Sequence, residues 1–326
     1  MSTTDAMIAA PECVNLEPAT DAELGRGHLS TTQIGTLLAC EQRWYWDQER
    51  RLRPAVRPVA LSLGAAFATA VEHGDPDRGA LALMDEWLRG SEEHGSNPWV
   101  VVPSREEAME QAAIVRGASR AYIGRYGSRE LREQRMRVRI RNPLTGRPSV
   151  TFDLVCRVDG LSDDASTLIE DKLVGQIPRK AGEMDRRLRL DRQLTIAAYC
   201  TWRTTGVLPS EIRYRMTLKP SIRQRQNESI EGYLKRVEAD YAERPDHYLA
   251  EFTATRTLED FARLERELWR WAEQLRSARA DGVWPRNTAA CADFGGCRFL
   301  PLCSGEPGAA HQFVEREVKT QEVVAA

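Results

Sequence analysis

Glu170 and Lys172 stand two residues apart in the segment TLIEDKLVGQ, directly after a short apolar run. In a β-strand, side chains two apart point to the same face, whereas Asp171 between them points to the other face. Charged groups are costly to bury, so a strand with a core-facing side has little reason to hold three together. The pattern indicates a site for chemistry, and an exposed strand end with an ion pair is the alternative.

Asp159 ends the preceding apolar segment, in CRVDG. If the two segments pair as strands, Asp159 and Glu170 come side by side, and two oxygen ligands at one place suit Mg²⁺ or Mn²⁺. A lysine beside them, Lys172, can orient a water molecule and stabilise negative charge at phosphorus. These residue types therefore indicate metal-assisted hydrolysis of a phosphodiester, with Asp159 and Glu170 as ligands of the cation.

Three cysteines near the C-terminus form a second candidate site. Cys291, Cys297 and Cys303 are separated by five residues in each interval, in a short glycine-containing segment where thiolates could converge on a metal. Cys40 is the best fourth ligand, because its predicted helix ends in aromatic residues that could shield the metal. The odd total of seven cysteines argues against a framework of disulfides, and both zinc and an iron–sulfur cluster fit the spacing.

The composition excludes several classes of protein. With 326 residues, of which 42% are hydrophobic and 29% charged, the chain is long enough for a large globular core. No apolar run approaches the roughly 18 residues that cross a bilayer. The N-terminal residues lack the basic and apolar regions of a secretory signal, so we expect a cytoplasmic protein without membrane contact.

The net charge of −2 hides a local excess of positive charge. Between residues 116 and 147 there are ten arginines and only two acids, Glu130 and Glu133. Such a surface could bind the phosphates of a nucleic acid, and a solvated face balanced by acids elsewhere is the alternative. Further arginines lie between residues 179 and 192.

Hydrophobic periodicity places these residues on elements. Ser30 with Gln33, and Ser104 with Glu107, have the spacing of capping boxes at helix starts. Alternating residues predict strands around residues 135–140, 149–162, 166–173 and 211–220, with a helix at 187–206 before the last strand and helices from there to about 283. This order, three strands in a meander, a helix and a strand, predicts a mixed α/β sheet flanked by helices.

The predicted domain organisation is simple. Residues 1–25 and 309–326 are expected to be tails, and residues 26–308 one domain, with a helical insertion at 75–130 and a cysteine loop at 284–308 that closes on Cys40. Cys13 lies in the first tail. Cys156 and Cys200 fall within apolar patterns and are expected to be buried.

The order of these motifs resembles the RecB-like exonucleases of the PD-(D/E)XK superfamily, above all the CRISPR-associated and phage-encoded members with an iron–sulfur cluster. The resemblance covers residues 29 to 304, from the helix carrying Cys40 to the last cysteine. It implies a PD-(D/E)XK core with a helical N-terminal part. It also implies that Asp159 and Glu170 bind the metal, that Lys172 is the catalytic lysine, and that Gln193 holds the site or the DNA. Cys40, Cys291, Cys297 and Cys303 would then hold a 4Fe-4S cluster.

The chain departs from the family pattern before the sheet. Ala68 stands where the family has a metal-binding histidine, and Glu72, one turn later and beside His73, could reach the metal instead. Ala197 replaces a tyrosine expected four residues after Gln193, and Tyr199 lies roughly on another face of that helix.

Three functions follow in order of preference. The first is a metal-dependent DNA exonuclease that acts on single strands or duplex ends, with Mg²⁺ or Mn²⁺ and a 4Fe-4S cluster as cofactors. The second, prompted by Ala68, is a DNA-binding or assembly subunit that keeps the fold with weak or no catalysis. The third, an electron-transfer protein, leaves Glu170 and Lys172 unexplained.

Overall fold

A computed structural model describes residues 27–56, 59–98, 100–128, 134–178, 182–292 and 296–316. The predicted N-terminal tail therefore lies outside the described residues. The segment 309–326, also predicted as a tail, is described as far as residue 316 and contains a short helix and a strand.

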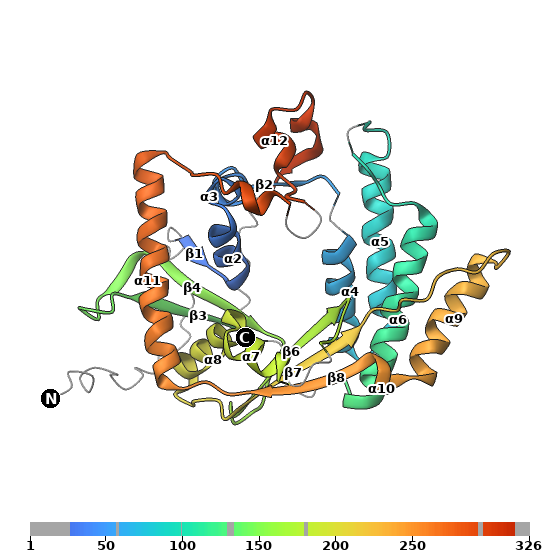
Figure 1. The fold of residues 1–326 in the computed structure, drawn as a ribbon, viewed down its shortest axis with the longest axis horizontal. Coiled ribbons are helices and arrows are strands. Elements are labelled where there is room, and N and C mark those ends of the chain that lie inside the picture. The colour runs from blue at the N-terminus through green and yellow to red at the C-terminus, as the bar shows by residue number, and fades with distance from the viewer. Residues whose placement is uncertain are drawn as a thin grey trace.

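Helices account for most of the regular structure (Figure 1). The α-helices are α2 (Thr31–Ala39), α3 (Glu41–Trp44), α4 (Val59–His73), α5 (Pro76–His94), α6 (Arg105–Tyr126), α7 (Glu183–Arg189), α8 (Arg192–Thr205), α9 (Ile230–Glu243), α10 (Pro245–Tyr248), α11 (Leu258–Asp281) and α12 (Leu300–Ser304). Three further turns are the π-helix η1 (Tyr45–Glu49) and the 3₁₀-helices η2 (Thr288–Cys291) and η4 (Ala309–Gln312).

The strands form three sheets. They are β1 (Gly27–Leu29), β2 (Leu52–Pro54), β3 (Gln134–Arg141), β4 (Pro148–Val158), β5 (Gly160–Leu161), β6 (Thr167–Val174), β7 (Glu211–Leu218), β8 (Leu249–Ala254) and β9 (Phe313–Glu315). The orders are β1-β4-β3, β2-β9 and β5-β6-β7-β8. The largest sheet is mixed, because β6 and β7 are parallel whereas β5 and β8 are antiparallel to their neighbours.

Helices α7 and α8 make the crossover between the parallel strands β6 and β7. A parallel pair needs such a connection, which carries the chain back across one face of the sheet. Apolar residues of α8, α11 and α2 join β3, β4, β6 and β7 in one core, which includes the buried Cys156 and Cys200. The prediction that these two cysteines are buried is confirmed.

A helical unit, made of α4, α5, α6 and α9, packs against the other face of the sheet. Apolar residues of α4, α5, α6 and α9 form a second core, and Leu173 of β6 and Leu218 of β7 pack against it. In Figure 1 these helices stand to one side of the sheet, and α8 and α11 lie toward the other side. The two strands β6 and β7 therefore separate two cores.

The predicted helix starts are present. Ser30 and Gln33 form a capping box at α2, and Ser104 and Glu107 form another at α6. Each box satisfies backbone N–H groups that the first helical turn leaves without a partner. The helical insertion predicted at 75–130 corresponds to α5 and α6 within the described residues.

Three expectations about the strands were wrong. The segment predicted as one strand at 149–162 is divided at Asp159 into β4 and β5, which belong to different sheets. The predicted meander is therefore interrupted, and β6 pairs with β5 and β7 rather than with β4. Residues 249–254 were expected to be helical but form β8, since backbone pairing with β7 decides the structure of this short segment.

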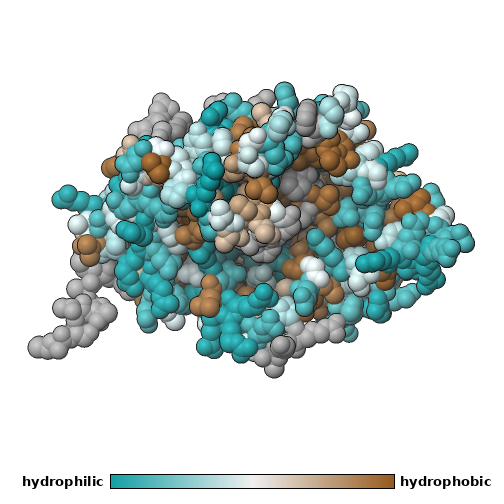
Figure 2. Space-filling model, turned by 45° about the horizontal axis from the view of Figure 1, so that its top comes forward, coloured by the Kyte–Doolittle hydropathy of each residue, from teal (hydrophilic) through white to brown (hydrophobic). Residues whose placement is uncertain are grey.

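The surface in Figure 2 is mainly hydrophilic, and apolar side chains lie on it in small groups. The most exposed large apolar residues include Val101, Leu144 and Leu190, which are far apart in the chain. Scattered apolar residues of this kind are normal on a protein surface. None of the helices in the described part of the chain is long and apolar enough to cross a membrane.

A substitution at Gly79 tests the packing of α5 on α4. A Cβ atom there would overlap the carbonyl oxygen of Ala66 and lie 2.6 Å from the Cβ atom of Ala70. We expect Gly79→Ala to lower the free energy of unfolding by about 1–3 kcal/mol, measured by urea denaturation. Gly64→Ala in α4 is the control: nothing lies within 4 Å of its added Cβ, so it should raise stability by about 0.5–1 kcal/mol. Equal effects would contradict this packing.

Candidate active site

Strand β6 brings Glu170 and Lys172 to the face that α8 covers. Glu170 is buried, with 3% of its surface exposed, and its Oε1 atom accepts a hydrogen bond from the Nε2 group of Gln193. The ammonium group of Lys172 forms an ion pair with Glu170 and donates to the Oε1 atom of Gln193 at 3.1 Å. Three of the four predicted catalytic residues therefore form one closed hydrogen-bonded group.

Asp159 joins this group through the backbone of β6. It lies at the break between β4 and β5, and its Oδ2 atom accepts a hydrogen bond of 2.9 Å from the backbone N–H of Asp171. Its negative charge also acts on Glu170. The two carboxylates are thus close in space although eleven positions apart in the chain, because β5 and β6 are antiparallel neighbours.

Burial governs the electrostatics of the group. Burial raises the pKa of Glu170 to about 8, the charge of Lys172 opposes this shift, and the charge of Asp159 adds to it. Burial also lowers the pKa of Lys172, but the carboxylate of Glu170 outweighs this effect, so the pKa lies above its ordinary value. Two carboxylates beside one ammonium, with Glu170 buried, favour an added cation.

The start of α8 positions Gln193. Asp191 is the N-cap, and its side chain accepts a hydrogen bond of 3.0 Å from the backbone N–H of Leu194. Arg256, 5% exposed, donates to the carbonyl oxygens of Leu188 at 2.6 Å and Asp191 at 3.0 Å. Arg256 thus fixes the corner between α7 and α8. No motif in the sequence marks this residue, which follows β8 in an ordinary polar turn.

Tyr214 of β7 is a second residue that the sequence did not single out. It is the register partner of Glu170 in the parallel pair, so its side chain lies on the same face. Burial raises the pKa of Tyr214, and the charges of Lys172, Asp191, Glu170 and Arg187 all act on its phenol. Tyr214 therefore forms a wall of the group, with Arg187 of α7 nearby. The strand alternation predicted its face but not its neighbours.

Asp171 points to the reverse face of β6, as the alternation predicts. Its Oδ1 atom accepts a hydrogen bond of 2.8 Å from the hydroxyl of Tyr122 on α6. Its neighbours on the chain, Glu170 and Lys172, contact Gln193 instead. The strand therefore separates two polar groups, one on each face.

Glu72 and Tyr199 are not part of this hydrogen-bonded group. Glu72 is exposed near the end of α4, and that helix packs through Phe67 against Tyr122 on the reverse side of β6. Its assignment as a metal ligand stays a prediction. His73, beside it, bonds the carbonyl oxygen of Thr69 at 2.9 Å within the same helix. The hydroxyl of Tyr199 donates to Glu265 of α11 at 2.8 Å and is therefore part of the helix packing.

A comparison with known protein families identifies the superfamily of the chain. The model of the PD-(D/E)XK nuclease superfamily matches residues 28–304, which contain both the sheet and the cysteines. The chain belongs to the PD-(D/E)XK nuclease superfamily. Membership indicates a metal-dependent nuclease that acts on DNA with Mg²⁺ or Mn²⁺, and it agrees with the mixed sheet flanked by helices. No curated protein matches the chain.

The cysteines of this nuclease gather at the ends of the matched region. The backbone N–H of Asn287 donates to the Sγ atom of Cys40 at 3.3 Å, and the indole N–H of Trp46 donates to that of Cys303 at 3.3 Å. The backbone N–H of Cys297 donates to the carbonyl oxygen of Cys291 at 2.8 Å. Segments that are about 250 residues apart in the chain are thus side by side.

The other three thiols act on Cys291. Burial raises the pKa of Cys291, and the thiols of Cys297, Cys40 and Cys303 raise it further. Within the described ranges, however, no three His, Cys, Asp or Glu side chains are grouped closely enough to hold one metal ion. The thiols are neighbours, but they do not form a closed site for a single ion.

The basic surface of this nuclease is smaller than the arginine count suggests. On α6, Arg116 pairs with Asp77 at 2.6 Å and with Glu238 at 3.0 Å, and Arg120 pairs with Glu238 at 3.1 Å. On β3, Arg137 pairs with the buried Asp153 at 2.8 Å. The solvated alternative therefore describes this part of α6. On α7, Arg186, Arg187 and Arg189 are exposed; Arg187 acts on Tyr214 and pairs with Glu183 at 4.0 Å.

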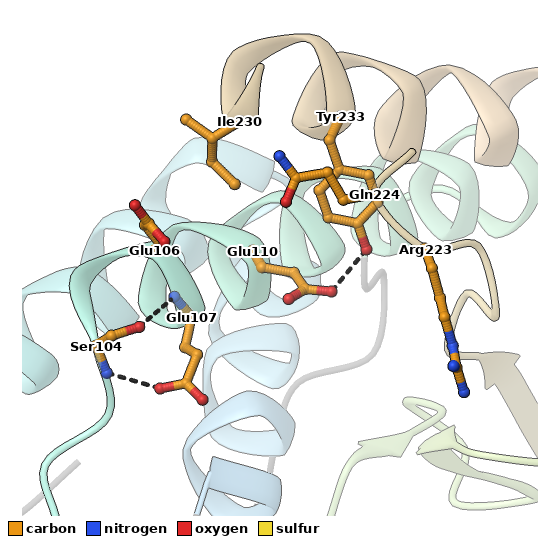
Figure 3. A pocket seen from close by; sticks show the side chains of 8 residues that line it. All are labelled: Ser104, Glu106, Glu107, Glu110, Arg223, Gln224, Ile230 and Tyr233. Carbon is orange, nitrogen blue, oxygen red and sulfur yellow. Dashed lines mark hydrogen bonds between the residues drawn. The ribbon is translucent and has the colours of Figure 1, made fainter. Parts of the chain in front are cut away.

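One cavity lies away from this group. It has a volume of about 480 Å³ and lies between the starts of α6 and α9 (Figure 3). Glu107 is held in the capping box of α6, and Glu110 accepts a hydrogen bond of 2.6 Å from Tyr233. Its three glutamates and single arginine, Arg223, would repel phosphate. The helix packing explains these glutamates without a ligand.

Proposed function

We propose that this nuclease is a metal-dependent DNA exonuclease of the RecB-like type, which hydrolyses single strands or duplex ends. The observation that carries the proposal is the closed group of Glu170, Lys172 and Gln193, to which the backbone of β6 ties Asp159. The superfamily model supports nuclease chemistry, and the exposed arginines of α7 support a nucleic acid as the substrate.

Asp159 and Glu170 would bind the Mg²⁺ or Mn²⁺ ion. Both are oxygen donors of the kind these cations prefer, and Glu170 is held with its carboxylate toward the group by Gln193. When bound there, the cation supplies polarisation of the phosphate and a lower pKa for water. A ligand contributed by Glu72 remains part of the proposal.

Lys172 would orient the attacking water and stabilise the negative charge that develops on the phosphate. In hydrolysis the water oxygen bonds to phosphorus, one phosphorus–oxygen ester bond breaks, and the leaving oxygen takes up a proton. Gln193 contacts both Glu170 and Lys172, so its role is to hold the carboxylate and the ammonium group in place. Arg187 and Tyr214 would contact the DNA at the edge of the group.

Cys40, Cys291, Cys297 and Cys303 would hold a 4Fe-4S cluster. Four thiols are the usual ligands of such a cluster, and Cys40, Cys297 and Cys303 lie within electrostatic range of Cys291. A cluster of several irons needs its ligands farther apart than a single zinc ion does, which suits thiols that are close but not closed around one point. Its role here is a structural cross-link between the two ends of the domain.

A catalytically weak DNA-binding or assembly subunit is the second candidate. The observation that favours it is Ala68 on α4, where a metal-binding histidine is usual, together with the ion pair that occupies Glu170. DNA binding without cleavage, across several metals and substrates, would select this function over the first.

The main test of the proposed function is the substitution of Lys172. On end-labelled DNA with Mn²⁺, Lys172→Ala should reduce the rate of cleavage by about 100-fold or more, because it removes the positive charge that stabilises the transition state. Lys235→Ala, at an exposed position of α9, is the matched control and should keep the full rate. Equal rates for the wild type and Lys172→Ala would contradict the mechanism, and cleavage of circular single strands would contradict exonuclease action.

Arg187→Ala tests the DNA contact. Arg187 is exposed near Tyr214 and its ion pair with Glu183 is long, at 4.0 Å, so its loss should weaken binding to all sequences alike and reduce the slope of log K against log salt by about 1. Arg120→Ala, whose charge is paired with Glu238, is the control and should leave the slope unchanged. The measurement is fluorescence anisotropy at several salt concentrations. An unchanged slope for Arg187→Ala would contradict a contact between α7 and the DNA.

Cys40→Ser and Cys303→Ser test the cluster. Each variant should lose iron and acid-labile sulfide. The free energy of unfolding should fall by about 5 kcal/mol, because a cross-link that closes roughly 250 residues contributes about that much stability. Cys13→Ser should change neither quantity. Elemental analysis and visible absorption make the measurement. A colourless wild-type protein with bound zinc would contradict the iron–sulfur assignment.

A further inference from the structure

Behind the candidate active site lies a row of polar side chains that the proposed mechanism does not use; Asp171 and Tyr122 are buried, and Glu251 is exposed. Asp171, Arg215 and Glu251 are register partners across β6, β7 and β8, so their side chains share the reverse face of the sheet. The Nε group of Arg215 pairs with the Oε2 atom of Glu251 at 2.7 Å. Tyr122 of α6 completes the row, because its hydroxyl accepts from the Nη1 group of Arg215 at 3.0 Å and donates to Asp171 at 2.8 Å.

The burial of two polar side chains of this row costs free energy of folding. Tyr122 is 1% exposed and Asp171 is 9% exposed, while Ile169 on the same face of β6 is buried and apolar. An apolar residue at position 171 would avoid the burial of a carboxylate, and well-packed apolar residues often replace buried ion pairs without loss of stability. Stability alone therefore does not explain why this aspartate stands between Glu170 and Lys172.

The backbone contacts of Asp171 explain why an aspartate stands at this position. The N–H of Asp171 donates to Asp159 at 2.9 Å, and the two residues bonded to Asp171 are Glu170 and Lys172. The side chain of Asp171 is held from the reverse face by Tyr122, whose ring packs edge-on against Phe67 of α4. A shift of Asp171 would therefore move both proposed metal ligands and the lysine at the same time.

We propose that Tyr122 and Asp171 are positioning residues that hold Asp159, Glu170 and Lys172 in the geometry needed to bind the cation, and that they couple this geometry to the helical unit of α4 and α6. The coupling is mechanical: a hydrogen bond from α6 fixes one residue of β6 between the two site residues. This inference rests on the proposed function of the site, and its test includes one measurement that does not.

Tyr122→Phe is the sharpest variant, because it removes one hydroxyl and keeps the ring. Groups that hold metal ligands in place typically change metal affinity or activity by about 10- to 100-fold when they are lost. We therefore expect the Kd for Mn²⁺ to rise and kcat to fall by about tenfold or more, with the KM for DNA unchanged. Asp171→Asn, which keeps an oxygen acceptor for Tyr122, should retain more activity than Asp171→Leu.

Tyr241→Phe is the matched control. Tyr241 is equally buried in the same helical core, and its hydroxyl donates to the carbonyl oxygen of Leu218 at 2.8 Å, away from Asp171. Tyr122→Phe loses two hydrogen bonds of a buried tyrosine and Tyr241→Phe loses one, so the melting temperature should fall in both variants and further in Tyr122→Phe. Equal effects of the two variants on Mn²⁺ affinity and kcat would overturn the positioning role.

Hydrogen exchange of the β6 amides separates this inference from the proposed function. Tyr122→Phe should reduce the protection of the Asp171 amide, which is bonded to Asp159, and Tyr241→Phe should leave it unchanged. A wild-type protein that binds no Mn²⁺ would contradict the proposed function, and the exchange result would still decide the positioning role. Unchanged protection in Tyr122→Phe would overturn it.

Discussion

The burial of Glu170 close to a second carboxylate and one ammonium is the constraint on which the site depends. Asp159 and Glu170 repel each other, burial raises the pKa of Glu170, and Lys172 compensates only part of the charge. Such a group is stable only if every polar atom is held, which is the task of Gln193 on α8 and of Arg256 behind it. The same imbalance of charge is what attracts a divalent cation.

The architecture follows from this constraint. A parallel pair of strands needs a crossover, and the crossover through α7 and α8 delivers Gln193 and the exposed arginines to the face of Glu170. The reverse face carries the helical unit, which reaches the strand through Tyr122 and Asp171. Strand β6 thus lies between two cores, and its central residues connect both of them.

Patterns with a strict period predicted which face of the sheet the residues of the candidate site share. The alternation of β6 gave the opposite faces of Glu170 and Asp171, and the capping signals gave the starts of α2 and α6. The strand β8 was missed because it is six residues long and stands between helices. Arg256, Tyr214 and the acids that neutralise the arginines of α6 were missed because their contacts join distant segments. Spacing along the chain carries no signal for such contacts.

The most direct measurement is a crystal structure of the protein soaked in Mn²⁺, with anomalous scattering to locate the ion. The central claim predicts a peak at about 2.0–2.3 Å from carboxylate oxygens of both Asp159 and Glu170, on the face of β6 that carries Lys172 and Gln193. A map with no peak there, in which Lys172 still pairs with Glu170 at saturating Mn²⁺, would contradict it.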